Sequence, residues 1–518
     1  MIDPGRRRLL QGGVAAGALF LPAPYAWVWA QSEGALKLLR APKLALVIGN
    51  GTYKDAPLKN PANDARAMSD ALVKIGFEVT ERLDATRAQM TSVIRSYTRT
   101  LAARKCVGVF YYAGHGVQLA WTNYLLPVDA EIGRLEDVPK QALAVTGLVS
   151  GITKAANPMN VIILDACRDN PLGRVKPNTR GLSQMDAPEA TLLAYATAPG
   201  NVASDGDGAN GLYTENLVRE LMVRETRIED VFKRVRLSVR RTSKGAQLPW
   251  ESTSLEEDFY FLPSERLKKL SDEEKQRLFK EELVVWQQIQ NSQDPAPLED
   301  YLRRYPSGNY VELAQLQLDR VLAARGENRI EIASQRGNPF TKGSAYARIS
   351  KVGDTVTYRA LDLRSRAERR TYTATVIKVT DTEVIRDDGF ISDLLGNQRR
   401  NRQGYANSPN QFVPLEFQVG KRWRAQFEVT DPQGVTWHAE QELRIVARER
   451  VTVPAGSFNA FRLEARGTSS PPQGPTESQV TRWHIPDFQW PVARDEVRRR
   501  GGKEVFTERL EMLSYKLA

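Results

Sequence analysis

The sequence predicts an α/β domain with a mainly parallel sheet sandwiched by helices, then a short α-helical connector, then a C-terminal all-β domain. Three observations support this fold class. Short apolar strands alternate with amphipathic helices over residues 43–262, residues 264–325 are helical with prolines between the helices, and residues 343–518 have the pattern of strands separated by turns. A length of 518 residues is enough for about three domains.

Residues 1–30 have the pattern of an export signal. Arg6 and Arg7 precede an apolar stretch over residues 12–21, and small residues lead up to Ala30, where a signal peptidase would cut. The arginine pair followed by two leucines resembles a twin-arginine signal. We expect an exported protein, periplasmic or secreted, with an uncleaved N-terminal anchor as the alternative.

Within residues 43–262 the apolar pattern alternates between continuous runs, which predict buried parallel strands, and a three-to-four-residue spacing, which predicts helices. The predicted strands are residues 44–49, 77–83, 106–112, 160–165, 191–197 and 259–262. The predicted helices are residues 64–75, 86–104, 145–156, 212–222 and 228–243. In such sheets a site forms beyond the carboxyl ends of the strands.

The connector, residues 264–325, predicts helices at 274–288 and 310–322, with prolines between them. Its apolar seam would consist of Trp286, Ile289, Leu302 and Tyr305. One or two helical hairpins fit this pattern. An interaction module and a plain spacer both remain open.

Residues 343–518 predict an all-β sandwich or barrel. The predicted strands are residues 355–358, 371–379, 423–429, 437–446, 458–465 and 480–484. The net charge of the chain is +11, and this segment has 28 Lys and Arg against 22 Asp and Glu. The basic excess is compatible with an anionic envelope partner through the helical and β domains, but ordinary solvated arginines on strands are the preferred interpretation. We expect no nucleic-acid partner.

A histidine and a cysteine each lie just beyond a predicted strand. His115 follows the strand at 106–112, and Cys167 follows the strand at 160–165, 52 residues later. Caspase-type cysteine proteases have a histidine about this far before the nucleophile. If these strands are parallel neighbours, both side chains lie at one sheet edge. The glycines on either side of His115 predict a tight, exposed loop, and the alternative is a core histidine beside an unrelated buried cysteine.

This pair could act as a base and a nucleophile. Because a thiolate is the reactive form of cysteine, it needs a nearby base, which His115 could supply. The amides of Gly116 and Cys167 are candidate oxyanion donors. Cys106 begins the neighbouring strand, so the two sulfurs would be on the order of 15–20 Å apart, too far for a disulfide. We expect Cys106 in the core and Cys167 as a free thiol.

Residues 43–262 resemble the caspase-like fold of clan CD cysteine peptidases, and specifically the bacterial metacaspase-like proteins, or orthocaspases. The resemblance rests on residues 46–50, 63–65, 112–116, 165–168, 194–200, 210–214 and 249–251. It implies a cysteine endopeptidase that cleaves protein or peptide substrates after Arg or Lys, with His115 as the base and Cys167 as the nucleophile. A catalytically idle caspase-like scaffold that acts through its β domain is the alternative.

The same resemblance implies that Asp165 and Asp64 line the pocket for the residue before the scissile bond. Two buried carboxylates would select the cationic stem of Arg or Lys. The alternatives are a helix N-cap for Asp64 and a strand-end turn residue for Asp165.

The segment after the nucleophile, residues 172–184, contains Arg174, Lys176 and Arg180, where a basic-specific enzyme could cut itself. An ordinary solvated loop is the alternative. We expect no cofactor and no metal site: residues 203–208 are acidic and glycine-rich but fail the calcium-loop pattern, so the calcium dependence of some metacaspases has no placed site here. His438 and His484 lack metal-ligand spacing and are predicted on a solvent face.

Overall fold

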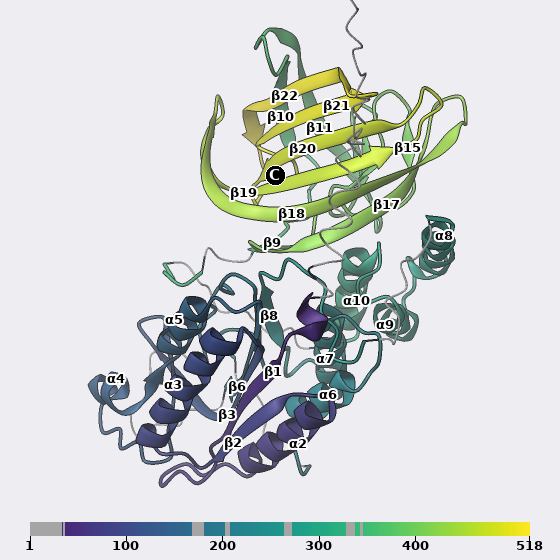
Figure 1. The fold of residues 1–518 in the computed structure, drawn as a ribbon. Helices are drawn as coiled ribbons and strands as arrows, with labels where there is room; N and C mark the ends of the chain where they lie inside the picture. Colours follow the sequence, from purple (N-terminus) through teal and green to yellow (C-terminus); the bar gives the residue numbers. More distant parts are fainter. Residues whose placement is uncertain are drawn as a thin grey trace, which may run out of the picture.

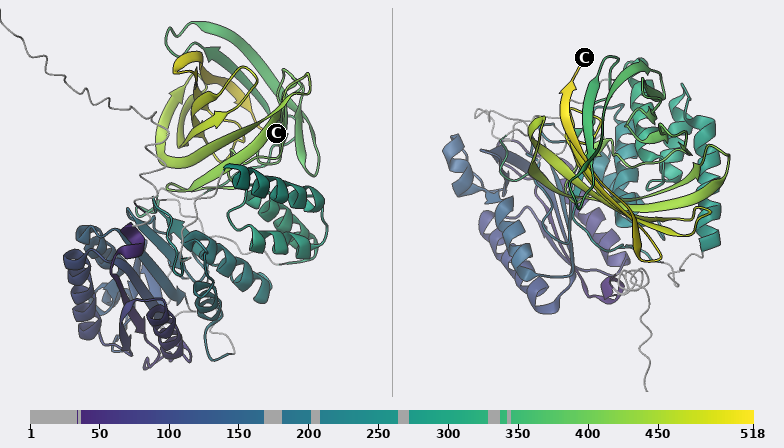
Figure 2. Two further views of the ribbon diagram at one scale, coloured as in Figure 1. Left: turned by 45° about the vertical axis from the view of Figure 1, so that its right-hand side comes forward. Right: turned by 90° about the horizontal axis from the view of Figure 1, so that it is seen from above.

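The computed structural model describes residues 34, 37–167, 181–201, 208–263, 272–327, 337–341 and 345–518. The predicted export signal and the predicted cleavage residues Arg174, Lys176 and Arg180 lie outside these residues. Figures 1 and 2 show an α/β layer structure, a helical unit beside it, and a β-barrel that lies over both. No helix among the described residues is long and apolar enough to span a membrane.

In the part of the chain that the structure describes, the α/β part is built on one sheet of eight strands. Its main path follows the order β2-β1-β3-β6-β7-β8, and a hairpin of β4 and β5 extends from β3. The strands are β1 (Lys43–Gly49), β2 (Glu78–Leu83), β3 (Val107–Leu119), β4 (Thr122–Leu125), β5 (Leu143–Ala144), β6 (Met159–Cys167), β7 (Thr191–Tyr195) and β8 (Trp250–Thr253). Strands β2, β1, β3, β6 and β7 are parallel, and β8 is antiparallel to β7. The predicted mainly parallel sheet is confirmed.

Helices cover both faces of this sheet. The helices are α2 (Pro61–Lys74), α3 (Arg87–Arg104), α4 (Val138–Gln141), α5 (Val145–Ala155), α6 (Leu212–Leu221) and α7 (Ile228–Thr242). Helices α3 and α5 pack together on one side, and α2, α6 and α7 on the other (Figure 1). Helix α3 begins where the sequence predicts, because Thr86 and Gln89 form a reciprocal capping box.

The predicted strand at residues 259–262 is wrong. Phe259 and Phe261 are buried, but their backbone is irregular, and only Tyr260 forms an isolated bridge, with Arg227. The apolar residues at 259–262 are therefore explained by burial in the core and not by a strand. The sheet ends instead with β8, which follows α7 in the chain and pairs antiparallel with β7.

Within the described residues 272–327, the helical unit has three helices: α8 (Asp272–Ile289), α9 (Pro295–Arg304) and α10 (Val311–Ala324). The sequence predicts only the first and third. Pro295 occupies the first position of α9, after the N-cap Asp294, so this proline starts a helix and does not only separate two others. Trp286 and Leu302 are buried in the seam between the helices.

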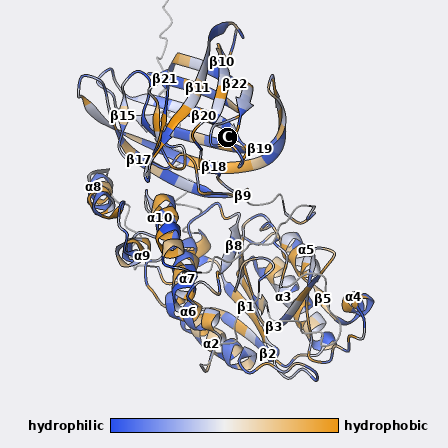
Figure 3. Cartoon of the chain, turned by 180° about the vertical axis from the view of Figure 1, so that it is seen from behind, coloured by the Kyte–Doolittle hydropathy of each residue, from blue (hydrophilic) through white to orange (hydrophobic). Residues whose placement is uncertain are grey.

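The C-terminal part closes into a barrel, since β10 pairs with both β11 and β22. Its strands are β10 (Thr355–Leu361), β11 (Glu368–Val379), β12 (Glu383–Arg386), β13 (Ile391–Asp393), β14 (Gln398–Arg400), β15 (Ala406–Asn407), β17 (Arg422–Thr430), β18 (Thr436–Val453), β19 (Gly456–Ser469), β20 (Thr476–His484), β21 (Ala493–Arg500) and β22 (Lys503–Lys516). Strands β9 (Ala345–Tyr346) and β16 (Glu416–Phe417) pair separately. Figure 3 shows polar and apolar residues interspersed along the barrel strands, and apolar residues concentrated in the α/β sheet.

His484 corrects a prediction within this barrel. It is 1% exposed and packs its ring against Phe417, so it lies on the inner face and not toward solvent. Burial, with a smaller contribution from the neighbouring Arg482, lowers its pKa to about 3. The alternation of the strand was evident in the sequence, but which face was enclosed depended on barrel closure. His438 is half-buried and contacts Phe279 of α8 edge-on.

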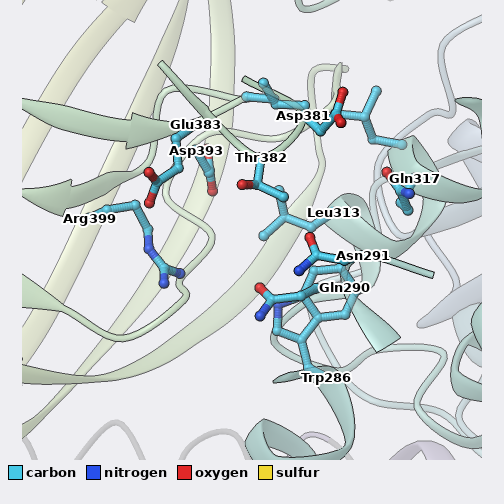
Figure 4. A pocket seen from close by; sticks show the side chains of 12 residues that line it. Trp286, Gln290, Asn291, Leu313, Gln317, Asp381, Thr382, Glu383, Asp393 and Arg399 are labelled. Carbon is cyan, nitrogen blue, oxygen red and sulfur yellow. The ribbon is translucent and has the colours of Figure 1, made fainter. Parts of the chain in front are cut away.

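Polar contacts fasten the barrel to the other two parts. Arg422 donates to the Leu255 carbonyl at 3.3 Å, and Lys421 pairs with Glu312 of α10 at 2.8 Å. Between α8, α10 and strands β12–β14 lies a cavity of about 180 Å³ (Figure 4). The buried carboxylate of Asp393 at its edge already accepts three hydrogen bonds, from the amides of Leu395 and Asn397 and from the Asn397 side chain.

The short segment 337–341 packs against the α/β part. The Asn338 side chain donates to the Gln184 carbonyl at 2.8 Å, and the Asp186 amide donates to the Phe340 carbonyl at 2.9 Å. Phe340 packs against the α/β core. We call residues 337–341 the strap, because they hold residues 183–186 in place.

Candidate active site

The two strands that carry His115 and Cys167 are parallel neighbours. Their register pairs Val107 with Met159 and continues to Ala113 opposite Asp165. It then shifts, and Gly116 stands opposite Cys167. One extra residue is thus accommodated in β3 between these two pairs, as in a β-bulge, a feature common beside active sites.

Gly114 forms the centre of this bulge. Its φ of +154° lies where side chains are disfavoured, and a Cβ there would be 2.7 Å from the hydroxyl oxygens of both Tyr53 and Tyr112. The predicted exposed loop is therefore wrong: His115 lies inside β3 and is 2% exposed. The glycines serve to bend a strand and bring tyrosines close, and not to make a surface turn.

His115 is held by its backbone and its ring. Its amide donates to the Tyr53 hydroxyl at 3.0 Å, and its carbonyl accepts from the Tyr112 hydroxyl at 2.9 Å and the Leu126 amide at 3.0 Å. The ring of Tyr53 packs on the imidazole with centroids 4.5 Å apart. Nε2 lies 2.7 Å from the Ala56 carbonyl, so Nε2 is the donor there and Nδ1 is the basic nitrogen of the neutral ring.

Cys167 is the last residue of β6, and the structure describes its backbone but not its side chain. Its Cα partner is Gly116, the residue after His115, and neighbouring strands lie about 4.8 Å apart. A Cβ on Gly116 would be 2.6 Å from the Ala166 carbonyl oxygen and 3.1 Å from Leu182 Cδ2. Only glycine allows the strands this approach. The backbones of the predicted base and nucleophile are therefore brought together.

Asp64 and Asp165 lie close together near the end of β6 that carries Cys167, and both are buried. The Gly211 amide donates to Asp64 Oδ1 at 2.8 Å, and the Thr214 hydroxyl donates to Asp165 Oδ2 at 2.9 Å. A Cβ on Gly211 would lie 3.2 Å from Asp64 Oδ2 and 3.8 Å from Asp165 Oδ2. The two carboxylates therefore flank the backbone of one glycine.

Neither alternative reading of these carboxylates fits the structure. Asp64 lies in the first turn of α2, whose N-cap is Asn60, and its carboxylate reaches across to Gly211 instead of capping the helix. Asp165 lies within β6 and not in a turn. Both side chains are thus directed to a shared buried location.

The acidic pair affects the pKa of two neighbouring tyrosines. Burial raises the pKa of Tyr111 well above its usual value, and the carboxylates of Asp165 and Asp64 raise it further. Burial also raises the pKa of Tyr213, again with contributions from Asp165 and from Glu251. Both phenols remain protonated, and Tyr111 shares a 2.6 Å hydrogen bond with the Thr214 hydroxyl.

Sequence reasoning missed the individual residues that hold the site. Gly211 and Thr214 lie in the Asn-Gly-Leu-Tyr-Thr block at residues 210–214, which was used only as a signature of the resemblance. Tyr53 carried no local signal, because its function depends on contacts with β3. Among the described residues no group of three or more His, Cys, Asp or Glu could hold a metal, and residues 203–207 lie outside that description.

Cys106 agrees with its prediction. It is free and fully buried, directly before β3, while Cys167 ends β6. Burial raises the pKa of the Cys106 thiol, which disfavours its reactive thiolate.

Comparison with known proteins identifies the α/β part. Residues 42–260 match the family described as Peptidase C14, caspase domain. The human mucosa-associated lymphoid tissue lymphoma translocation protein 1 is 28% identical over 187 residues, which are 35% of this chain and 22% of that protein. The mouse homolog is also 28% identical over 187 residues, 35% of this chain and 21% of its own length. The matched region is thus about a fifth of these relatives.

Proposed function

Since residues 42–260 form a caspase domain of the C14 peptidase family, we propose that this chain is a cysteine endopeptidase of metacaspase type that cleaves after Arg or Lys. The observation that carries the proposal is the register of β3 and β6. Gly116 is opposite Cys167 and Ala113 is opposite Asp165 in this register, which supports a base, a nucleophile and an acidic pocket at one sheet edge.

The chemistry begins with transfer of the Cys167 thiol proton to His115 Nδ1, because the Ala56 carbonyl occupies Nε2. The thiolate attacks the scissile carbonyl, and the amides of Gly116 and Cys167 stabilise the oxyanion. His115 returns the proton to the leaving amine as the thioester forms. Water then hydrolyses the thioester, with His115 accepting the proton of the attacking water and the thiol being regenerated.

The preference for Arg or Lys follows from two buried carboxylates that flank Gly211. A guanidinium or ammonium group entering between them would replace lost solvation with charge-assisted hydrogen bonds. An acidic substrate residue would instead be repelled there. Protein or peptide substrates with a basic residue before the scissile bond are therefore the expected partners.

Three further expectations belong to this proposal. Self-cleavage at Arg174, Lys176 or Arg180 would follow from the same specificity, since these residues come shortly after the nucleophile. Export through residues 1–30 would place the enzyme in the periplasm or outside the cell. The helical unit and the barrel would then position the peptidase on an envelope partner.

The decisive experiment measures hydrolysis of short fluorogenic peptides that differ only in the residue before the cleaved bond: Arg, Lys, Asp or Ala. We expect turnover of the Arg and Lys peptides, and none with the Cys167→Ala variant. An arginine chloromethyl ketone should modify one thiol. The matched control, Cys106→Ala, should retain both turnover and labelling, because Cys106 is buried far from the site.

The scaffold alternative makes the opposite prediction. An idle caspase-like domain would leave all four peptides intact over a range of pH and calcium concentration, and the ketone would label neither cysteine. Turnover of the Asp peptide in preference to the basic ones would retain the enzyme but contradict the specificity.

A further inference from the structure

The inner face of the barrel carries arginines on its β20–β22 side. On β20, Arg482 lies between Val480 and His484, which are two positions away on either side and are both buried in the barrel. Its side chain lies over the Phe412 ring, whose centroid is 5.3 Å from the guanidinium carbon. Arg482 therefore points into the barrel.

Carboxylates on the same inner face partly compensate these arginines. Glu508 accepts from Arg370 at 2.7 Å and from Arg494 at 2.6 Å. Glu496 pairs with Arg498 at 2.5 Å and with Arg494 at 3.5 Å. The side chain of Glu508 is 1% exposed, so this network begins deep in the wall.

Two more arginines join the network, Arg386 from β12 and Arg402 from the turn after β14. Asp388 pairs with Arg386 at 3.0 Å and with Arg402 at 2.7 Å. Arg402 lies over the ring of Tyr372, and Tyr372 is two residues from Arg370 on the same face of β11. The two sets of ion pairs are therefore neighbours.

We name these arginines the barrel arginine cluster. Its members are Arg370, Arg386, Arg402, Arg482, Arg494 and Arg498. The carboxylates that pair with them are Asp388, Glu496 and Glu508. The cations outnumber the anions by two to one, so the folded barrel is left with a local positive charge.

Arg482 concentrates this excess. It stands directly opposite Arg494 in the register of β20 and β21, and like charges in directly opposed positions destabilise a sheet. Among the described residues Arg482 has no ion-pair partner, and its guanidinium group lies over the Phe412 ring. Burial and the charge of Arg494 lower the pKa of Arg482 to about 10, yet the group stays protonated near neutrality.

The outer end of the cluster is accessible to solutes. The side chains of Arg370 and Arg498 are 50% and 51% exposed. Both lie near the end of their strands, on the same strand face that lines the barrel interior further along. Aromatic rings support the guanidinium planes, with Arg402 3.5 Å from the Tyr372 centroid and Arg498 5.0 Å from that of Phe506. Rigidly held, stacked guanidinium groups suit bidentate recognition of planar or tetrahedral oxyanions.

We propose that the barrel arginine cluster is the binding site for a small soluble anion with at least two carboxylate or phosphate groups, which bridges Arg482 and Arg494. The ligand supplies the negative charge that the barrel wall lacks. This site is distinct from the peptidase site, and it gives the barrel a function of its own.

Isothermal titration of the full chain with citrate and with pyrophosphate, at constant ionic strength, tests the site. We expect saturable binding to the unaltered protein that weakens by about tenfold or more in Arg482→Gln. The matched control is Arg450→Gln, which removes the same charge from an exposed position of β18. Without anion, the melting temperature of Arg482→Gln should not fall, because the substitution removes a repulsion.

If Arg482→Gln fails to fold, the anion affinity is measured instead in Arg498→Gln, at the exposed end of the cluster, where the same weakening is expected. Equal affinity in all variants, or no saturable binding, would overturn the proposal. Sedimentation with vesicles of phosphatidylglycerol and phosphatidylcholine distinguishes a lipid headgroup from a free anion. Binding to those vesicles without any response to citrate or pyrophosphate would also overturn it.

Discussion

Gly116 and Cys167 are opposed residues of two parallel strands, and a bulge one step earlier places His115 beside that pair. The two strands can approach this closely because residue 116 is a glycine: a Cβ at that position would lie 2.6 Å from the backbone carbonyl oxygen of Ala166. The backbone of Gly116 thereby lies next to that of Cys167.

Gly116→Ala should therefore damage the site more than it damages the fold. We expect kcat/KM on an Arg peptide to fall by about a hundredfold or more, as when an oxyanion donor is displaced, and the unfolding free energy to fall by about 1–3 kcal/mol from the clash. Peptide hydrolysis and chemical denaturation measure the two effects. Gly147→Ala, where a Cβ would meet nothing within 4 Å, is the control. Unchanged activity would remove Gly116 from the proposed oxyanion hole.

Asp165→Asn should weaken basic substrates selectively. Loss of one buried charge from the acidic pair should reduce kcat/KM for Arg and Lys peptides by roughly a hundredfold, corresponding to ~3 kcal/mol of transition-state stabilisation. Asp64→Asn should act in the same direction. Glu78→Gln, an exposed substitution beside Arg104, should leave the kinetics unchanged. An Asp165→Asn enzyme with the original preference for Arg would contradict the pocket assignment.

The barrel should lose stability in acid because of His484. Its pKa is lowered to about 3 in the folded state from an ordinary value of 6.5. The unfolded state therefore binds a proton first, and the stabilising contribution of the neutral ring is lost as the pH falls from about 6.5 toward 3. At pH 5 the expected loss is about 2 kcal/mol.

Urea denaturation at pH 7 and pH 5 checks this expectation in the unaltered protein and in His484→Leu. The leucine variant should lose less stability between the two pH values, because it has no group to protonate there. The same loss in both proteins would show that other groups account for the acid sensitivity.

Phe340 in the strap should support the peptidase site from a distance. The strap holds residues 183–186, and the preceding Leu182 packs beside Gly116. Phe340→Ala should lower the unfolding free energy by about 2–4 kcal/mol and reduce kcat, whereas Phe340→Leu should restore most of both. Thermal melts and peptide kinetics on the same preparations provide the readout. Full kcat in Phe340→Ala despite a lower melting temperature would show that the strap stabilises the fold without positioning the site.

The sequence by itself determined the α/β class, most helix and strand positions, and the placement of His115 and Cys167 on two neighbouring strands. These features are encoded locally, in apolar periodicity, the Thr86 cap and specific motifs. It also located Asp64 and Asp165, whose short sequence blocks are distinctive. It missed α9, because a proline was taken as a break and not as a first helical residue.

Tertiary structure alone decided what depends on distant partners. The bulge at Gly114, the burial of His115 and its contact with the Ala56 carbonyl arise from packing of β3 against other segments. Closure of the barrel decided that His484 and Arg482 lie inside, although their strand alternates in the same way in either orientation. The alternation of apolar and polar residues predicts that a strand has two different faces, but only its pairing with strands distant in sequence determines which face is enclosed.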